Sequence, residues 1–223
     1  MKCLFKYLLI ALLFFINGPV VNAQSGRFDN EISAFKKQDS ISFPPKNAIL
    51  FIGSSSFRMW KNIGEDFPGY TIINRGFGGS TLLDVIDHAD ELIFPYEPRQ
   101  VVIYAGDNDL ASSDTITSQM VVDRFKNLFF LIRDRMPAVP VVFVSIKPSP
   151  SRERLLLKMK EANKAIKDFL KKKANTSYVD VFDKMTGRKD RIKTDLFLED
   201  NLHMNAKGYA IWKELITAYL LKD

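Results

Sequence analysis

The stretch AILFIGSSS, residues 48–56, decides the fold class. Its first five residues are apolar without interruption, which is typical of a strand buried on both faces of a parallel sheet. Gly53 ends this strand, and three serines follow it directly. In open α/β sheets the ligand lies outside the carboxyl ends of the strands. The stretch therefore predicts a buried strand with a polar site at its end.

Further apolar runs along the chain resemble this strand, at residues 70–75, 101–105, 139–146 and 177–182. The last run alternates more between apolar and polar residues, so we expect it at an edge of the sheet. Patterns with helical spacing lie between and after these runs, at residues 81–96, 120–136, 152–173 and 206–221. Strands that alternate with helices predict an α/β fold, in which a parallel sheet carries helices on both faces. Because no internal repeat or linker interrupts the order, a single domain is favoured.

The composition is that of an ordinary globular protein. The chain has 223 residues, of which 46% are hydrophobic and 26% are charged, and this excludes disordered, collagen-like and low-complexity classes. Its single cysteine cannot form an internal disulfide, and its two histidines leave little material for a zinc site. We therefore expect no metal and no cofactor. The chemistry should come from oxygen nucleophiles, carboxylates and the two histidines.

The formal net charge is +6, but the basic residues are scattered along the chain. The one run, Lys171–Lys173, is typical of a helix C-terminus or a solvated face. Nucleic-acid binding would require a basic stripe with interleaved aromatic residues, and the sequence contains none. Nucleic acid is therefore not an expected partner. The oligomeric state cannot be read from this pattern.

The first 23 residues have the pattern of a secretory signal peptide. Lys2 and Lys6 precede an apolar run at residues 7–16, and a small-residue site ends at Ala23. The run is too short for a membrane span, although an uncleaved N-terminal anchor remains the alternative. We expect residues 1–23 to be removed and residues 24–223 to form one domain, secreted or periplasmic. A bacterial periplasm is preferred, because the remaining chain has no cysteine and needs no oxidative folding.

Small and polar residues follow each of the first three expected strands. They occupy residues 53–56, 76–80 and 106–109. Because the carboxyl ends of parallel strands meet at one edge of a sheet, these loops should converge on a single crevice. Glycine loops expose backbone N–H groups, and Asn108 adds a side-chain amide, so the crevice could bind an oxyanion. The alternatives are tight turns for the glycines and an Asx turn for Asn108.

A serine hydroxyl in this crevice would need a neighbouring base to become a nucleophile. His88 lies among helix-forming residues and is expected on a helix surface or in packing. His203 follows Asp200 by three residues, in a turn before a helical segment. In this spacing the carboxylate can orient the imidazole, which leaves the other ring nitrogen free to accept the serine proton. The alternative is a helix start, with Asn205 or Asp200 as the N-cap.

Two segments approach other known motifs, and each departs from its motif at one required residue. The segment that begins at Gly76 approaches the dinucleotide-binding pattern G-x-G-x-x-G, but Thr81 stands where the third glycine belongs. The segment that begins at Gly53 approaches the nucleophile elbow G-x-S-x-G, but Phe57 replaces its last glycine. Dinucleotide binding and an α/β-hydrolase of that kind are therefore disfavoured.

Taken together, the loops resemble the four sequence blocks of the SGNH (GDSL-like) hydrolases. Gly53-Ser54-Ser55 resembles the first block, Gly79 falls at the glycine of the second, Asn108 at the asparagine of the third, and Asp200-x-x-His203 matches the fourth. Ser54 departs from the pattern, because the family has aspartate there. This departure leaves Ser54 or Ser56 as other candidates for the reactive hydroxyl, although the block spacing favours Ser55.

The resemblance implies a three-layer α/β/α, flavodoxin-like fold with a five-stranded parallel sheet of order 2-1-3-4-5. It also implies a serine esterase without a metal, in which Ser55 is the nucleophile, His203 the base and Asp200 its orienter. The oxyanion hole would consist of the N–H groups of Ser55 and Gly79 and the Asn108 amide.

The segment Lys147–Arg152 is similar to one in lysophospholipases and platelet-activating-factor acetylhydrolases, and suggests that branch. We interpret the segment as a rim loop in which Arg152 is a candidate substrate contact. The expected substrates are acetyl or short acyl esters of a carbohydrate or a lysophospholipid. The alternative function is a catalytically silent module that binds a glycan or an anion in the same crevice.

Overall fold

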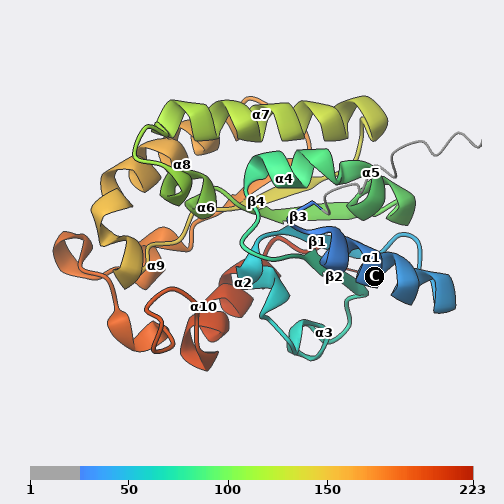
Figure 1. The fold of residues 1–223 in the computed structure, drawn as a ribbon, viewed down its shortest axis with the longest axis horizontal. Coiled ribbons are helices and arrows are strands. Elements are labelled where there is room, and N and C mark those ends of the chain that lie inside the picture. The colour runs from blue at the N-terminus through green and yellow to red at the C-terminus, as the bar shows by residue number, and fades with distance from the viewer. Residues whose placement is uncertain (1–25, 223) are drawn as a thin grey trace, which may run out of the picture.

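The structure is a computed structural model that describes residues 26–222. Its centre is a sheet of five parallel strands in the order β2-β1-β3-β4-β5 (Figure 1). The strands are β1 (Ile49–Gly53), β2 (Ile72–Gly76), β3 (Gln100–Tyr104), β4 (Val141–Val144) and β5 (Thr176–Val179). The predicted fold class and strand order are confirmed, and the alternating run forms an edge strand. The predicted signal peptide, residues 1–23, lies outside the described residues.

Helices cover both faces of the sheet, which gives three layers (Figure 1). One face carries α4 (Leu82–Asp87), α5 (Ala89–Leu92), α7 (Ser118–Arg135) and α8 (Leu156–Leu170). The other carries α2 (Ser55–Arg58), α3 (Ile63–Asp66) and α10 (Ala206–Thr217). Short elements complete the chain: α6 (Asp107–Ser112), α9 (Phe182–Met185), η1 (Phe94–Tyr96), η2 (Pro150–Leu155), η3 (Arg188–Asp190) and η4 (Thr194–Leu196).

Strand β1, which lies between β2 and β3 in the sheet, contributes side chains to both cores. Leu50 and Ile52 belong to the core beneath α7 and α8, whereas Ile49 and Phe51 belong to the core beneath α10. This follows from the strand period of two, which sends successive side chains to opposite faces. All five residues of β1 are buried. The uninterrupted apolar run therefore reflects burial on both sides, as expected.

The register of the strands brings three loops to one level. Gly53 at the end of β1 pairs with Gly76 at the end of β2 and with Tyr104 at the end of β3. Because all three strands are parallel, the segments that follow them leave the sheet at the same edge. The fold therefore places residues far apart in the chain around one position.

Two predicted helices differ from the structure. The expected helix over 81–96 is divided into α4, α5 and η1, because His88 leaves helical geometry (φ −104°, ψ 15°) and Pro95 cannot continue an α-helix. The expected helix over 152–173 begins as η2 and becomes α-helical at Leu156. Arg152 departs from helical angles (φ −122°, ψ 22°), and its side chain reaches the loop after β3.

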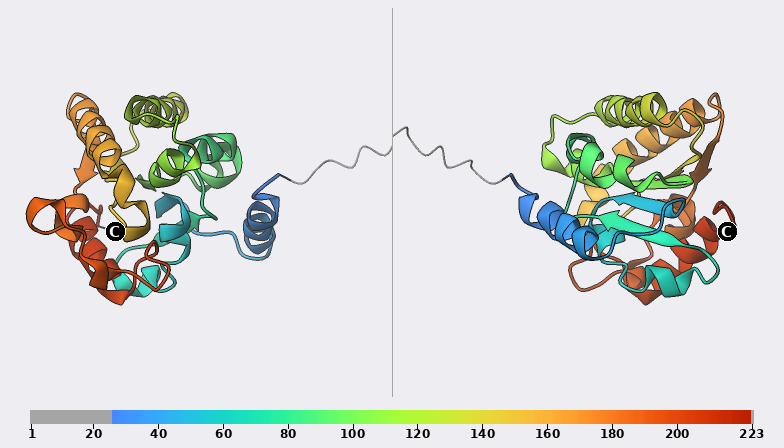
Figure 2. Two further views of the ribbon diagram at one scale, coloured as in Figure 1. Left: turned by 60° about the vertical axis from the view of Figure 1, so that its left-hand side comes forward. Right: turned by 90° about the vertical axis from the view of Figure 1, so that its right-hand side faces the viewer.

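Helix α1 (Asp29–Ile41) is not among the elements predicted from the sequence. Only Ile32 is buried within it, so its apolar pattern is weak. Figure 2 shows α1 at the side of the molecule, where it packs against α5. Within residues 26–222, no helix is both long enough and apolar enough to span a bilayer.

Candidate active site

The nucleophile candidate Ser55 lies at a sharp turn between β1 and α2. The turn depends on Gly53, whose φ is +137° and where a Cβ atom would lie 1.9 Å from the Tyr104 carbonyl oxygen. Only glycine fits this backbone. The next residue, Ser54, donates its N–H to the same carbonyl at 3.0 Å. This geometry presents Ser55 as the first residue of α2, with 8% of its surface exposed.

Ser55, His203 and Asp200 form a continuous chain of hydrogen bonds. The Ser55 Oγ lies 3.0 Å from Nε2 of His203, and Nδ1 of the same ring lies 2.6 Å from Oδ2 of Asp200. The hydroxyl groups of the two flanking serines, Ser54 and Ser56, do not take part in this chain of hydrogen bonds. Ser54 and Ser56 are buried, and the Ser54 Oγ has no hydrogen-bond partner among the described residues. Only Ser55 of the three serines meets the imidazole.

Asp200 is fixed and kept ionised by its surroundings. Its second oxygen, Oδ1, accepts the N–H groups of Leu202 and His203, both at 2.9 Å. Desolvation opposes ionisation, but the hydrogen bond from the His203 ring and those from the two N–H groups outweigh it, so the pKa of Asp200 falls to about 2. The carboxylate can therefore hold the Nδ1–H tautomer of His203 and stabilise an imidazolium.

Contacts other than those of Asp200 also hold the loop that carries His203. Asn205 is the N-cap of α10, where its side chain accepts the N–H groups of Lys207 and Gly208. The helix-start interpretation is thus correct for Asn205, and Asp200 is left to bind the imidazole. Lys147, which is 1% exposed, donates from Nζ to the Leu202 carbonyl at 2.9 Å and holds the loop from below.

The two predicted oxyanion positions, Gly79 and Asn108, are adjacent. The Asn108 Nδ2 donates to the Ser80 carbonyl at 3.0 Å, and a Cβ atom on Gly79 would lie 3.7 Å from that nitrogen. Gly79 has neither a positive φ nor a steric conflict, unlike Gly78 before it, whose φ is +30° and where a Cβ would meet the Phe28 ring at 2.3 Å. Turn geometry therefore explains Gly78 but leaves Gly79 without a structural reason.

Arg152 connects this amide to a buried carboxylate. Its Nη1 donates to Oδ2 of Asp107 and its Nη2 to Oδ1 of Asn108, both at 2.7 Å. Since Oδ1 of Asn108 is engaged in this way, the orientation of the amide is set and Nδ2 is turned toward Gly79 and Ser80. Asp107 is 4% exposed, and its Oδ2 also lies 3.8 Å from Nζ of Lys147.

These residues surround a cavity of about 360 Å³. Its walls combine residues from all three strand ends and from the fourth block, among them Ser55, Gly79, Asn108, Arg152, Leu202 and His203. His88 does not line it; its ring packs edge-on against Phe77 at 5.9 Å between centroids.

The cavity also contains two arginines that the sequence analysis missed as site residues. Arg27 precedes the first expected element, so no motif pointed to it. Arg58 lies three residues after Ser55 on α2, a spacing that places both on one side of a helix. The buried Lys147 could have been noticed, because it directly follows the apolar run at residues 139–146.

A protein-family comparison agrees with this arrangement of loops. The model of the GDSL-like lipase/acylhydrolase family matches residues 39–211, which is most of the chain. The chain belongs to this family. It is accordingly an ester-hydrolysing serine hydrolase. No protein with a curated description matches the GDSL-like chain.

Solved structures share the GDSL-like fold at low sequence identity. A Streptococcus pneumonia protein described as a platelet activating factor candidate has a TM-score of 0.75 and 21% identity, with 86% of this chain and 92% of that chain covered. A GDSL-like lipase from Bacteroides thetaiotaomicron has a TM-score of 0.73 and 20% sequence identity, with 84% of this chain and 96% of that chain covered. An acetylxylan esterase from Geobacillus stearothermophilus has a TM-score of 0.63 and 13% sequence identity, with 78% of this chain and 94% of that chain covered.

Proposed function

We propose that this protein is an exported serine esterase that removes acetyl or short acyl groups from a carbohydrate or a lysophospholipid. The observation that carries the proposal is the hydrogen-bond chain from Ser55 through His203 to Asp200. The cavity of about 360 Å³ is near the lower end of the usual size range for ligand sites, which supports a short acyl group.

In the first half of the reaction, Ser55 is acylated. Its Oγ attacks the ester carbonyl carbon while Nε2 of His203 takes the hydroxyl proton, and the carbonyl oxygen becomes an oxyanion. The tetrahedral intermediate then collapses, the bond to the alcohol breaks, and the leaving oxygen receives the proton from Nε2. Asp200 keeps the ring oriented and stabilises the imidazolium throughout.

In the second half, water takes the place of the alcohol. Nε2 removes one proton from the water as its oxygen attacks the acyl carbon, and the second intermediate releases the carboxylic acid. The proton returns from Nε2 to the Ser55 oxygen, which restores the starting state. Both intermediates place negative charge on the same oxygen, so one set of donors serves both steps.

The oxyanion donors in this proposal are the N–H groups of Ser55 and Gly79 and the Asn108 amide. Three features support them: Gly79 has no steric or backbone requirement for glycine, it lies beside the amide, and Arg152 fixes the amide's orientation. One such donor contributes a factor on the order of 10²–10³ to the rate of acyl transfer.

The catalytic assignment is tested with 4-nitrophenyl acetate and the variants Ser55→Ala and Ser54→Ala. We expect Ser55→Ala to abolish turnover above the background, while Ser54→Ala, which removes a neighbouring hydroxyl without a partner, retains turnover. Equal activity of Ser55→Ala and the unmodified protein would overturn the proposal. A series of 4-nitrophenyl esters from acetate to octanoate then gives the acyl length, with the highest kcat/KM expected for the shortest members.

Export is proposed from the signal-peptide pattern of residues 1–23. Expression of the full chain in a bacterial host, followed by N-terminal analysis of the exported protein, tests it. We expect the exported form to begin at Gln24, after Ala23. Retention of the full chain in the cytosol would contradict this expectation.

A further inference from the structure

The active-site cavity carries an excess of positive charge. Arg27, Arg58 and Arg152 line it, and no aspartate or glutamate does so within the described part of the chain. Beyond the nucleophile, the base and its orienting carboxylate, hydrolysis of a neutral ester requires only donors for the developing oxyanion. Two of these guanidinium groups have no role in the mechanism derived above, so their presence calls for another ligand.

Arg152 is already engaged, because its guanidinium is hydrogen-bonded to Asp107 and to Asn108. The other two groups differ. Among residues 26–222, Arg27 forms only a long hydrogen bond of 3.5 Å to the Gly79 carbonyl oxygen and lies over the Phe28 ring. Arg58 forms an ion pair with Glu31 in which Nη1 lies 3.8 Å from Oε2, too far for a hydrogen bond. Both therefore retain N–H donors for an anion.

These two arginines come from supported positions. Arg58 belongs to the same short helix as Ser55, and the neighbouring Phe57 is fully buried. Arg27 precedes Phe28, which is 5% exposed and packs edge-on against Phe77. Glu31 also accepts the N–H of Gly78 at 3.0 Å, so its charge is shared with the backbone. The pair is thus held at the cavity rather than on a free tail.

We propose that Arg27 and Arg58 form an anion subsite, and that the substrate is an ester bearing a carboxylate or phosphate within a few bonds of the scissile ester. A guanidinium group presents its donors in a planar fork that matches both anions. The proposal rests on the proposed esterase function and specifies its substrate class. An acylated acidic sugar would supply the carboxylate, and a lysophospholipid would supply the phosphate.

The test compares anionic and neutral esters that share a scissile bond. On the alcohol side, 4-acetoxybenzoate and 4-acetoxyphenyl phosphate are each compared with methyl 4-acetoxybenzoate. On the acyl side, mono-4-nitrophenyl succinate is compared with its methyl ester. For each pair, the ratio of anionic to neutral kcat/KM is measured in the unmodified protein and in Arg27→Gln and Arg58→Gln. Arg135→Gln, at the opposite end of the sheet, is the matched control.

We expect the ratio of at least one pair to fall about tenfold in each of the two variants, which corresponds to the loss of one charge-assisted hydrogen bond. Arg135→Gln should leave every ratio unchanged. The responding pair identifies the anion as carboxylate or phosphate. Ratios that stay constant in both variants for all pairs would overturn the subsite. Absence of turnover of every ester, anionic and neutral, by the unmodified protein would instead overturn the esterase function.

A separate observation concerns the buried ions behind the oxyanion donors. Lys147, Asp107 and Arg152 form a row in which the central carboxylate lies 3.8 Å from the lysine and 2.7 Å from the arginine. One end of the row holds the Leu202 carbonyl and the other holds the Asn108 amide. The row thus connects the loop of His203 with the loop of Asn108.

The geometry points to Arg152 as a positioning residue that acts through Asn108. In that case, removal of Arg152 should cause no further loss of kcat once the Asn108 amide has been removed. We expect Arg152→Ala to lower kcat on 4-nitrophenyl acetate by roughly tenfold to a hundredfold with a small change in KM, as a misplaced oxyanion donor would. The double variant Arg152→Ala/Asn108→Ala should be no slower than Asn108→Ala alone.

Two measurements keep this test decisive. Circular dichroism and the melting temperature establish that each variant is folded, and Arg152→Lys replaces Arg152→Ala where the latter does not fold. Added guanidinium ion should restore part of the lost kcat of Arg152→Ala. Additive losses in the double variant, or a loss confined to KM, would show that Arg152 acts independently of the amide and would overturn its positioning role.

Discussion

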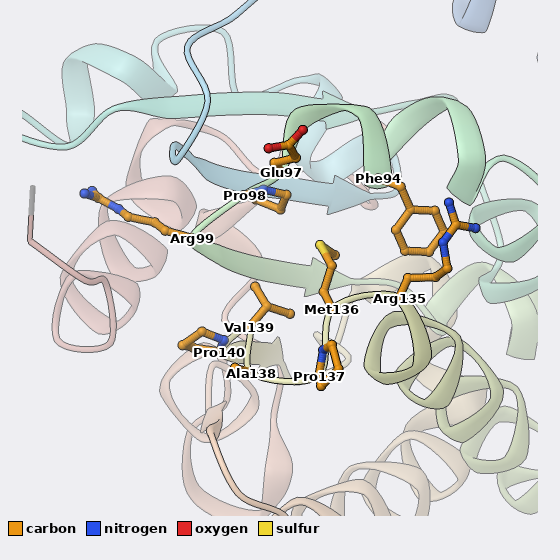
Figure 3. A pocket seen from close by; sticks show the side chains of 10 residues that line it. All are labelled: Phe94, Glu97, Pro98, Arg99, Arg135, Met136, Pro137, Ala138, Val139 and Pro140. Atoms are coloured by element: carbon orange, nitrogen blue, oxygen red, sulfur yellow. The ribbon is translucent and has the colours of Figure 1, made fainter.

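The two ends of the sheet differ in what their loops can do. The carboxyl end holds the cavity of about 360 Å³ around Ser55, whereas the amino end holds a larger one of about 540 Å³ (Figure 3). The larger cavity is lined by the segments before β3 and β4, and among the residues that the structure describes neither a serine nor a histidine lines it. The larger of these two cavities therefore lies at the end without a candidate nucleophile or base, whereas strand polarity points to the carboxyl end.

The chemical difference lies in the backbone. Prolines 98, 137 and 140 line the amino-end cavity, and proline has no N–H to offer an oxyanion. In this cavity Arg135 lies over the Phe94 ring, with 4.3 Å between the guanidinium carbon and the ring centroid. Figure 3 shows these two side chains next to each other. At the carboxyl end, Gly79 is partly exposed and lies beside the Asn108 amide. The same fold thus has a proline-lined cavity at one end of the sheet and the candidate active site at the other.

The largest expected contrast between the two ends comes from Asp200→Asn. Its carboxylate stays ionised down to about pH 2, so the substitution removes a charge that is present throughout the neutral and mildly acidic range. We expect kcat on 4-nitrophenyl acetate to fall by about 10⁴, because an amide no longer holds the required tautomer of His203. Arg135→Ala at the other end should not alter kcat. A loss below tenfold in Asp200→Asn would contradict the role of Asp200.

Asn108→Ala should have the next largest effect. It removes one oxyanion donor and leaves the nucleophile and base in place, so kcat should fall by about 10²–10³. A fluorophosphonate should still label Ser55 in this variant, although more slowly. Measurement of both rates separates loss of a donor from loss of the fold. Unchanged kcat would remove Asn108 from the oxyanion hole.

Much of this site could be predicted from the sequence, because its parts follow strand ends. The apolar run before Gly53 predicts a strand buried on both faces, and the polar residues after β1, β2 and β3 predict that the three loops converge. The positions of Arg27, Arg58 and the Lys147 row could not be predicted in the same way. They depend on side chains that reach across from other elements, as Arg152 reaches Asn108, and no local pattern records such contacts.

Within the loop after β2, the adjacent residues Gly78 and Gly79 should respond differently to substitution by alanine. A methyl group on Gly79 would meet the Asn108 amide at an ordinary contact distance of 3.7 Å, so Gly79→Ala should fold normally and lower kcat about tenfold by crowding the donors. Gly78→Ala should instead destabilise the fold by about 1–3 kcal/mol, because of its positive φ and the Phe28 ring. Urea unfolding and ester turnover of both variants check this, and the reverse assignment would contradict it.

A further expected effect concerns the pH dependence of stability that is linked to Lys147. Burial lowers the pKa of its ammonium group to about 8, with Arg152 acting in the same direction and Asp107 and Asp200 opposing. The unfolded chain holds this proton up to about its ordinary value of 10.5, so it binds more protons than the folded chain between pH 8 and pH 10.5. Stability linked to Lys147 therefore rises with pH across this window.

Urea unfolding of the unmodified protein and of Lys147→Met at pH 7.5, 9 and 10.5 measures this linkage. The free energy of unfolding of the unmodified protein minus that of the variant should increase as the pH rises, by at most about 3 kcal/mol. The comparison with Lys147→Met cancels the titration of other groups. A constant or shrinking difference would contradict the burial of a charged Lys147.

Labelling with a fluorophosphonate, followed by peptide mass spectrometry, tests the central assignment most directly. The account predicts one label per chain, on Ser55, and a labelling rate that falls sharply in His203→Ala. A label on Ser54 or Ser56, or an active enzyme that takes no label at all, would contradict it.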